Sequence, residues 1–150
     1  MKREFKFRAW HHDTKQFYHF DFADLEANMI IVWGGNGLGI HPNRLIPLNE
    51  CIVQQYSGLI DCYSHEICEG DIVKVYDPEN KFILRFGRVA RNVVSYDKTT
   101  VFPLDINGYY FEAVDNHKAY YSIIKNSHGV HDLNGTAVIG NIFENKELLT

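Results

Sequence analysis

Alternating runs of aromatic and branched residues restrict the fold of this chain more than any other feature. Phe, Tyr and Trp make up 14% of its 150 residues, and they occur with Val, Ile and Thr between clusters of Asn, Asp and Gly. Such side chains pack well on pleated, half-buried surfaces. The sequence therefore predicts a mainly β fold of short antiparallel strands, barrel-like, forming a single domain over residues 1–150 with one or two short helices.

The opening of the chain shows the clearest alternation. In residues 4–10, Phe7 and Ala9 fall on one face and basic residues on the other. The polar segment 11–15 predicts a turn into a second strand over 17–20, and therefore a hairpin. The same pattern predicts further strands at 51–56, 72–76, 82–86, 88–96, 99–104, 109–114, 119–125 and 137–143.

Two glycines have specific predicted roles in this arrangement. Gly70 is expected to adopt positive φ before Asp71, whose carboxylate can accept a nearby backbone N–H. Gly140 lies within an apolar strand and predicts a bulge or a close backbone approach. Asn145 is a candidate cap for one helical turn that ends at Leu149.

Residues 21–49 form a variable excursion without a regular pattern. Apolar residues behind Asp21 fall at helical spacing, so a short helix competes there with irregular structure. The glycine-rich run 34–39 and the turn formers at 41–44 are expected to lie outside any packed element. A phosphate-binding loop is disfavoured at the glycines, because no Gly-Lys-Ser/Thr sequence follows them.

Three blocks of the sequence resemble one known family. They are Lys-Phe-Arg-Ala-Trp at 6–10, the segment 55–73 with Glu-Gly-Asp at its end, and Val-Ile-Gly-Asn-Ile-Phe-Glu-Asn at 138–145 followed by Glu-Leu-Leu. In order and composition these blocks resemble the YopX proteins, which are associated with bacteriophages and prophages. The family usually has Asn-Gly where this chain has Ser64-His65. The resemblance implies a β-dominated, phage-encoded protein and leaves its biochemical role unassigned.

Charge and cysteine content narrow the setting in which the protein acts. Lys and Arg number 15 against 19 Asp and Glu, a formal net charge of −4, which disfavours nonspecific coating of DNA but allows one basic patch. The odd set of Cys51, Cys62 and Cys68 indicates reduced thiols. With no signal peptide and no apolar stretch of about 18 residues, the expected location is the cytoplasm of a bacterial host, without membrane association.

A candidate binding face comes from basic and aromatic residues on adjacent predicted strands. Its residues are Lys74, Tyr76, Arg85, Arg88 and Arg91, near the rings of Phe86 and Tyr96. Exposed aromatic rings stack on nucleic-acid bases, and arginines contact phosphates. The leading hypothesis is a non-enzymatic binding module without a cofactor, whose partner is a host or phage protein or a nucleic acid. Self-association through an unpaired strand edge is a further possibility.

The rival hypothesis is a small metal-dependent hydrolase or nuclease. His128, His131 and Asp132 could bind an ion together with His19 or His117, although Gly129 prevents a helical presentation of the pair.

A second potential ligand set, Cys62, His65 and Cys68, lacks zinc-finger spacing, and no metal site is predicted there. The carboxylates of Asp61, Glu66, Glu69 and Asp71 are expected to form a solvated rim. No nucleophile elbow is present in the sequence.

Overall fold

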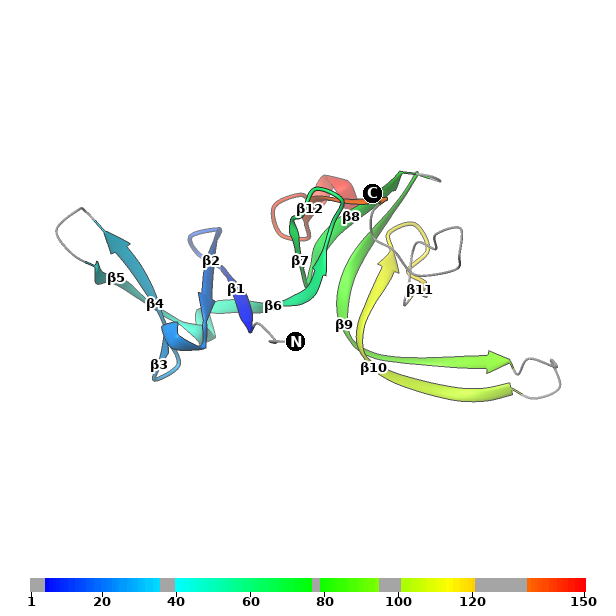
Figure 1. Ribbon diagram of the computed structural model, residues 1–150, viewed down its shortest axis with the longest axis horizontal. Helices are drawn as coiled ribbons and strands as arrows, with labels where there is room; N and C mark the ends of the chain where they lie inside the picture. Colours follow the sequence, from blue (N-terminus) through cyan, green and yellow to red (C-terminus); the bar gives the residue numbers. More distant parts are fainter. Residues whose placement is uncertain (1–4, 36–39, 77–78, 95–100, 121–134) are drawn as a thin grey trace. The chain divides into compact units, whose positions relative to one another are not determined.

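The computed structural model describes residues 5–35, 40–76, 79–94, 101–120 and 135–150 (Figure 1). Within these ranges the side chains of 33–35, 40–43, 76, 79, 89–94 and 101–106 lie outside the description. The chain divides into two compact units, residues 1–59 and residues 60–150. The expectation of a single domain over 1–150 stays a prediction.

Unit 1 begins with the predicted hairpin. β1 (Lys6–His11) pairs antiparallel with β2 (Gln16–Asp21) on one side and with β6 (Cys51–Ile60) on the other, so that Ala9 lies opposite both Tyr18 and Val53. The predicted alternation is confirmed, because Ala9 is fully buried and Phe7 packs against the same core.

A second sheet in unit 1 occupies most of the stretch that the sequence left without pattern. β3 (Leu25–Glu26), β4 (Met29–Gly35) and β5 (Ile40–Pro47) pair antiparallel in that order. Residues 41–44 were expected to lie outside any packed element, but their backbone is part of β5. Pro42 lies in the edge strand beside a register shift, where its missing N–H is tolerated.

The two sheets of unit 1 enclose a small apolar core. Ala9 and Phe20 from the first sheet meet Ile30 and Ile46 from the second, and all four are buried. Half-buried residues of both sheets surround them. Burial of these side chains removes apolar surface from water and holds the sheets together.

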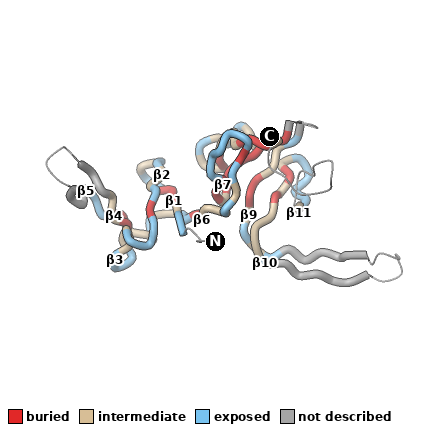
Figure 2. The backbone as a smooth tube through the Cα atoms, viewed as in Figure 1, coloured by how far each residue is buried: buried red, intermediate tan, exposed pale blue. Residues whose placement is uncertain are grey.

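Unit 2 contains one five-stranded antiparallel sheet in the order β11-β10-β9-β8-β12 (Figure 1). Its strands are β8 (Asp71–Tyr76), β9 (Glu79–Val94), β10 (Val101–Ala113), β11 (Ala119–Tyr120) and β12 (Thr136–Asn141), and the short β7 (Glu66–Cys68) precedes them. Ile72, Val73 and Leu84 are completely buried in this unit (Figure 2).

β9 and β10 are longer than predicted. The sequence suggested breaks near Gly87 and between 104 and 109, but thirteen consecutive pairs connect Phe82 with Ala113 at one end and Val94 with Val101 at the other. Gly87 lies directly opposite Gly108. The ladder therefore continues through both glycines, because pairing needs only their backbone groups.

The β class and the antiparallel pairing are confirmed. In the part of the chain that the structure describes, each sheet has a linear strand order with two edges, so these sheets are open and no closed barrel forms. The helices of the described residues are 3-10 turns: η1 (Phe22–Asp24), η2 (Leu48–Glu50) and η3 (Lys146–Leu149). The helix expected after Asp21 is thus one turn, with the Asp21 carboxylate as its cap.

Candidate functional site

The five residues of the predicted binding face lie on two neighbouring strands. Lys74 and Tyr76 belong to β8, and Arg85, Arg88 and Arg91 belong to β9. The side chains of Tyr76 and Arg91 fall outside the described residues. Because successive strand residues point to opposite faces and β9 pairs without a bulge, Arg88 lies on the opposite face from Arg85.

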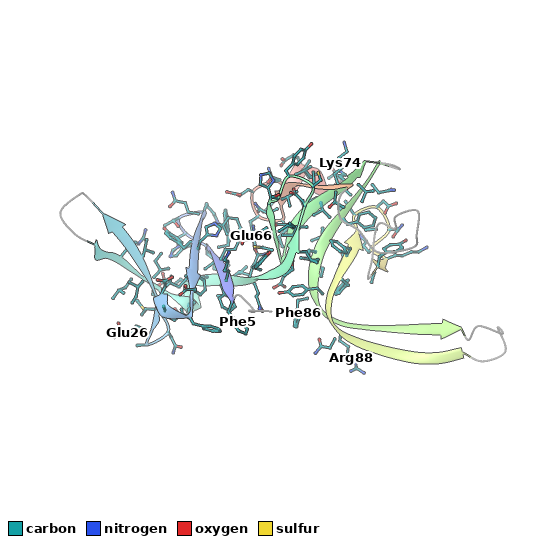
Figure 3. The ribbon with its side chains drawn as sticks, viewed as in Figure 1. Phe5, Glu26, Glu66, Lys74, Phe86 and Arg88 are labelled. Carbon is teal, nitrogen blue, oxygen red and sulfur yellow. The ribbon has the colours of Figure 1, made fainter. Side chains whose placement is uncertain are left out.

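One face of the β9–β10 ribbon carries an exposed aromatic ring beside an arginine. Phe86 is 53% exposed and contacts Tyr109 edge-on, with ring centroids 5.1 Å apart. Arg88 follows two residues later on the same face, opposite Asn107 (Figure 3). We call Phe86, Arg88 and Tyr109 the ribbon cluster.

The ribbon cluster lies where the ribbon leaves the sheet. β8 pairs with β9 only from Glu79 to Ile83, and β11 pairs with β10 only at Phe111 and Glu112. Beyond these pairs, β9 and β10 pair with each other and with no third strand among the described residues. Both edges of this part of the ribbon therefore present backbone groups outside the sheet.

Arg85 is neutralised locally. Its Nε lies 3.4 Å from Oε2 of Glu112, and Nδ1 of His117 lies 3.2 Å from Oε1 of the same carboxylate. The Arg85 charge is therefore offset on its own face and contributes less to an electrostatic surface than the sequence suggested.

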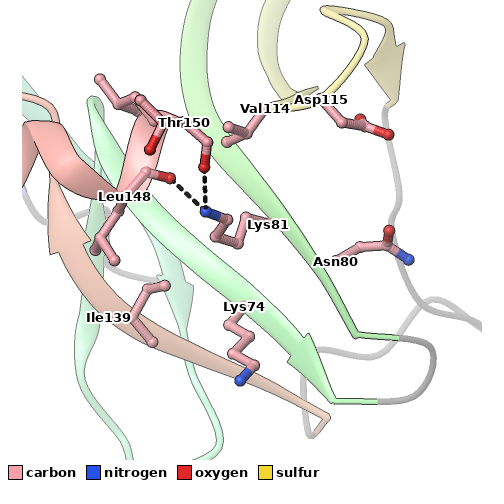
Figure 4. Close-up of a pocket in the computed structure, with 9 residues that line it drawn as sticks. Lys74, Asn80, Lys81, Val114, Asp115, Ile139, Leu148 and Thr150 are labelled. Carbon is pink, nitrogen blue, oxygen red and sulfur yellow. Dashed lines mark hydrogen bonds between the residues drawn. The ribbon is translucent and has the colours of Figure 1, made fainter.

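Lys74 lies in a pocket of unit 2 together with Lys81, on the face opposite the ribbon cluster. The two lysines are directly opposite each other on β8 and β9. Sequence reasoning missed Lys81, because the predicted strand began at residue 82 and left Lys81 outside it, whereas β9 begins at Glu79. Of the predicted residues with described side chains, Lys74 thus lines the pocket (Figure 4), Arg88 belongs to the ribbon cluster, and Arg85 is paired with Glu112, so they do not form one face.

The carboxylate of Asp61 organises the turn before β7. Its Oδ1 accepts the backbone N–H groups of Tyr63 and His65 at 2.8 and 2.9 Å, and its Oδ2 accepts Val138 N–H at 2.9 Å. His65 Nδ1 lies 3.3 Å from the same Oδ2. Burial raises the pKa of Asp61, but these hydrogen bonds from Val138, His65 and Tyr63 together outweigh burial and hold its pKa below the ordinary value.

The solvated rim predicted for four carboxylates is wrong for two of them. Asp61 and Asp71 are 4% and 2% exposed, and each accepts backbone N–H groups, Asp71 from Cys68 at 2.8 Å. Glu66 is exposed as expected. Gly70 has φ of +79°, which confirms its predicted role in front of Asp71.

The cysteine and histidine residues at 62, 65 and 68 do not form a cluster. Cys62 is exposed, Cys68 is buried, and His65 is bound to Asp61. Across the described ranges no group of three or more His, Cys, Asp or Glu side chains is placed to hold a metal ion. His128, His131 and Asp132 lie outside the described residues, as do Tyr96 and the centre of the glycine-rich run.

Comparison with known proteins places the chain in a family. The family model described as YopX protein matches residues 6–150. The chain belongs to the YopX family. This agrees with the three sequence blocks noted above and extends the match across both units.

The YopX chain also resembles a solved structure, the crystal structure of protein EF1440 from Enterococcus faecalis. The two have a TM-score of 0.57 and 22% sequence identity, with 99% of this chain and 100% of that chain covered. At this identity the likeness shows the fold alone. No curated protein is significantly similar to the chain. No helix in the described part of this YopX protein is both long enough and apolar enough to span a bilayer.

Proposed function

We propose that this YopX protein is a non-enzymatic binding module, encoded by a phage or prophage, that contacts its partner through the β9–β10 ribbon. The observation that carries the proposal is the ribbon cluster, in which an exposed phenylalanine and an arginine share one face where two strands leave the sheet. Exposed aromatic residues and arginine are enriched where proteins contact partners.

Single-stranded nucleic acid fits the ribbon cluster best. Stacking of a base on an aromatic ring contributes about 1 to 3 kcal/mol, and this part of the binding energy does not come from phosphate neutralisation. A chain with a net charge of −4 lacks the basic surplus that duplex coating needs. Binding through one ring and one arginine is compatible with that charge.

The test is a titration with labelled single-stranded and duplex oligonucleotides of the same sequence at two salt concentrations. We expect saturable binding of the single strand with a shallow salt dependence, and Phe86→Ala should lower the affinity about fivefold or more. Arg88→Gln should lower both affinity and salt slope. Tyr63→Ala is the control. Tyr63 is 64% exposed in the same unit but does not belong to the ribbon, so this variant should bind the single strand like the parent protein.

Absence of binding and of any salt slope would exclude nucleic acid as the partner. The ribbon would then be tested as a protein surface, by affinity capture from infected host cells with the parent chain and with Phe86→Ala side by side. A protein retained by both baits equally would contradict a role for the ribbon.

Phage origin is supported by membership of the YopX family, and action in the host cytoplasm by the three free cysteines. Sequencing of the DNA on both sides of the gene tests the origin, and phage genes are expected there.

Self-association through a ribbon edge is tested by light scattering. A mass near 17.4 kDa would indicate a monomer and exclude self-association.

A further inference from the structure

The outer part of the β9–β10 ribbon consists of two strands alone. From Phe86 and Tyr109 outward the strands pair with each other as far as Val94 and Val101, and with no third strand in the part of the chain that the structure describes (Figure 1). A two-stranded ribbon is marginally stable by itself in water, and further strands stabilise it. The ribbon would therefore gain stability from a strand added at one of its edges.

Two hydrogen bonds fix the direction in which the backbone groups of β9 point. The N–H of Val114, directly after β10, donates to the carbonyl oxygen of Lys81 at 3.0 Å, so Lys81 points toward β10. The carbonyl oxygen of Leu84 accepts the N–H of Gly70, directly before β8, at 2.8 Å, so Leu84 points away from β10. This direction alternates along a strand, and β9 pairs with β10 without a bulge. The even-numbered residues of β9 therefore direct their N–H and C=O groups outward.

The two edges of the ribbon differ in their hydrogen-bond donors. The outward positions of β9 beyond Leu84 are Phe86, Arg88, Ala90, Asn92 and Val94. The outward positions of β10 lie opposite these, and one of them is Pro103, opposite Asn92. Proline has no N–H, and natural proteins use it to protect strand edges from pairing. Of the two edges, the β9 edge thus has the uninterrupted row of outward N–H and C=O groups.

A second copy of this chain fits the β9 edge, because the edge matches itself in an antiparallel pairing centred on Ala90. All five outward positions then find a partner, with Phe86 opposite Val94 of the second copy and Arg88 opposite Asn92. Like charges directly opposite each other destabilise a sheet, and this register contains none. A pairing centred on Arg88 would instead set that arginine opposite its own copy. Phe86, 53% exposed in the single chain, gains an apolar neighbour.

We infer that two copies of this protein dimerise by antiparallel pairing of their β9 edges, which joins the two ribbons into one four-stranded sheet. The contact has a two-fold axis at Ala90, the commonest symmetry of homo-oligomers. The self-association left open above is thereby assigned to one edge and one register. Dimerisation does not require nucleic acid, because base stacking uses the face of the ribbon and dimerisation uses its edge.

Light scattering of the parent chain over a range of concentrations is the first test. We expect a mass near twice 17.4 kDa that falls toward the monomer on dilution. Ala90→Pro removes an outward N–H at the centre of the contact and leaves the hydrogen bonds to β10 intact. Each dimer would lose two hydrogen bonds, so the dissociation constant should rise about tenfold or more.

Asn107→Pro is the matched control for this variant. Asn107 lies opposite Arg88 and is therefore an outward position of β10. The same change on the other edge of the ribbon should leave the mass of the protein unchanged.

Disulfide formation tests the register. In a Cys62→Ser background, which removes an exposed native thiol, Ala90→Cys should oxidise to a covalent dimer. Directly opposite residues of a hydrogen-bonded antiparallel pair have Cα atoms about 5.5 Å apart, within the range that a disulfide spans. Asp105→Cys, directly opposite Ala90 on β10, should not form a covalent dimer.

A parent chain that stays monomeric at every concentration would overturn the inference, and if it still binds single strands the proposed function would stand. An oligomer that Ala90→Pro does not weaken, or that both prolines weaken equally, would also overturn it. If circular dichroism shows that Ala90→Pro fails to fold, the disulfide decides. Cross-linking at position 105 as readily as at position 90 would assign the contact to another surface.

Discussion

Asp61 shows how one side chain connects segments that are far apart in the sequence. Its carboxylate binds the turn at 63–65 and the backbone of Val138, which is 77 residues away. Because the hydrogen bonds lower its pKa, Asp61 stabilises the folded state fully above the ordinary aspartate value near 4. This stabilisation is lost as the pH falls through the lower folded value.

Asp61→Asn should destabilise the protein by about 1 to 3 kcal/mol at neutral pH. An asparagine Oδ1 can still accept from Tyr63 and His65, but its amide group would face the N–H of Val138 without an acceptor. Urea unfolding at neutral pH and near pH 3 measures this, and the gap between parent and variant should narrow in acid. Asp115→Asn, at an exposed carboxylate, is the control. A gap that widens in acid would contradict the assigned role of Asp61.

Ser64 adopts φ of +65° in the same turn. Left-handed backbone costs an L residue about 1 to 2 kcal/mol, and glycine avoids this cost but loses more entropy on folding. Ser64→Gly should therefore raise stability by up to about 1 kcal/mol, measured as the urea midpoint. Ser64→Ala keeps the strained backbone and should give no gain. Equal midpoints for the two variants would show that the turn is unstrained.

Local chemistry predicted some residue roles and not others. Gly70 and Asp71 were predictable because their partners are close in sequence, as with the Asp71 bond to Cys68. Asp61 was not, because Val138 is brought to it by the sheet. Arg85 and Arg88 are three residues apart, so they lie on opposite faces of a continuous strand. The sequence did not predict this, because a break was expected at Gly87 between them.

At the scale of the element, Gly140 allows β12 to pass the last turn of the chain. The register of β12 against β8 shifts between Val138 and Gly140, as predicted from the glycine. Asn145 Oδ1 accepts the N–H of Asn141 next to it, at 3.1 Å. A Cβ at position 140 would lie 2.5 Å from that oxygen and 2.9 Å from the Asn145 Cβ, closer than atoms can approach.

Gly140→Ala should therefore cost about 1 to 3 kcal/mol through overpacking. Gly108→Ala is the matched control, since a Cβ there meets no atom within 4 Å, and its effect should be small. Thermal unfolding compares the two variants. If the contact with Asn145 is the cause, Asn145→Ala should cost less in the Gly140→Ala background than in the parent chain, and strict additivity would exclude this explanation.

Element prediction succeeded where alternation was regular and failed where pairing overrode local preference. The opening hairpin, β8 and residues 51–56 of β6 followed from their side-chain pattern, whereas the extension of β6 to Ile60 did not. β5 did not, because His41 to Arg44 look like turn formers and are held extended by pairing with β4. The ribbon was predicted in four pieces, because glycine and proline within a strand weaken its local signal.

On the scale of the whole molecule, the sequence does not reveal the division at residues 59 and 60, since composition does not change there. Both tryptophans, Trp10 and Trp33, lie in unit 1. Tryptophan fluorescence therefore reports on unit 1 alone, whereas far-ultraviolet circular dichroism reports on both units. The chain thus contains its own probe for the independence of the units.

The single-domain prediction expects one unfolding transition in urea, coincident by both probes. A unit of about 60 residues buries a smaller fraction of its surface than a larger domain does and is marginally stable alone, which favours unfolding together with its neighbour. The unfolding midpoints and slopes from the two signals are compared on the parent chain. A fluorescence midpoint clearly below the dichroism midpoint would mean two domains.

The in-register pairing of β9 with β10 has a consequence for the reach of the protein. Adding the same even number of residues to both strands would leave every pair nearer the sheet in place and keep each face where it is. Each added pair would move the tip outward by about 3.4 Å. The ribbon is therefore an extensible arm, whose length can change while the pocket and the buried carboxylates keep their geometry.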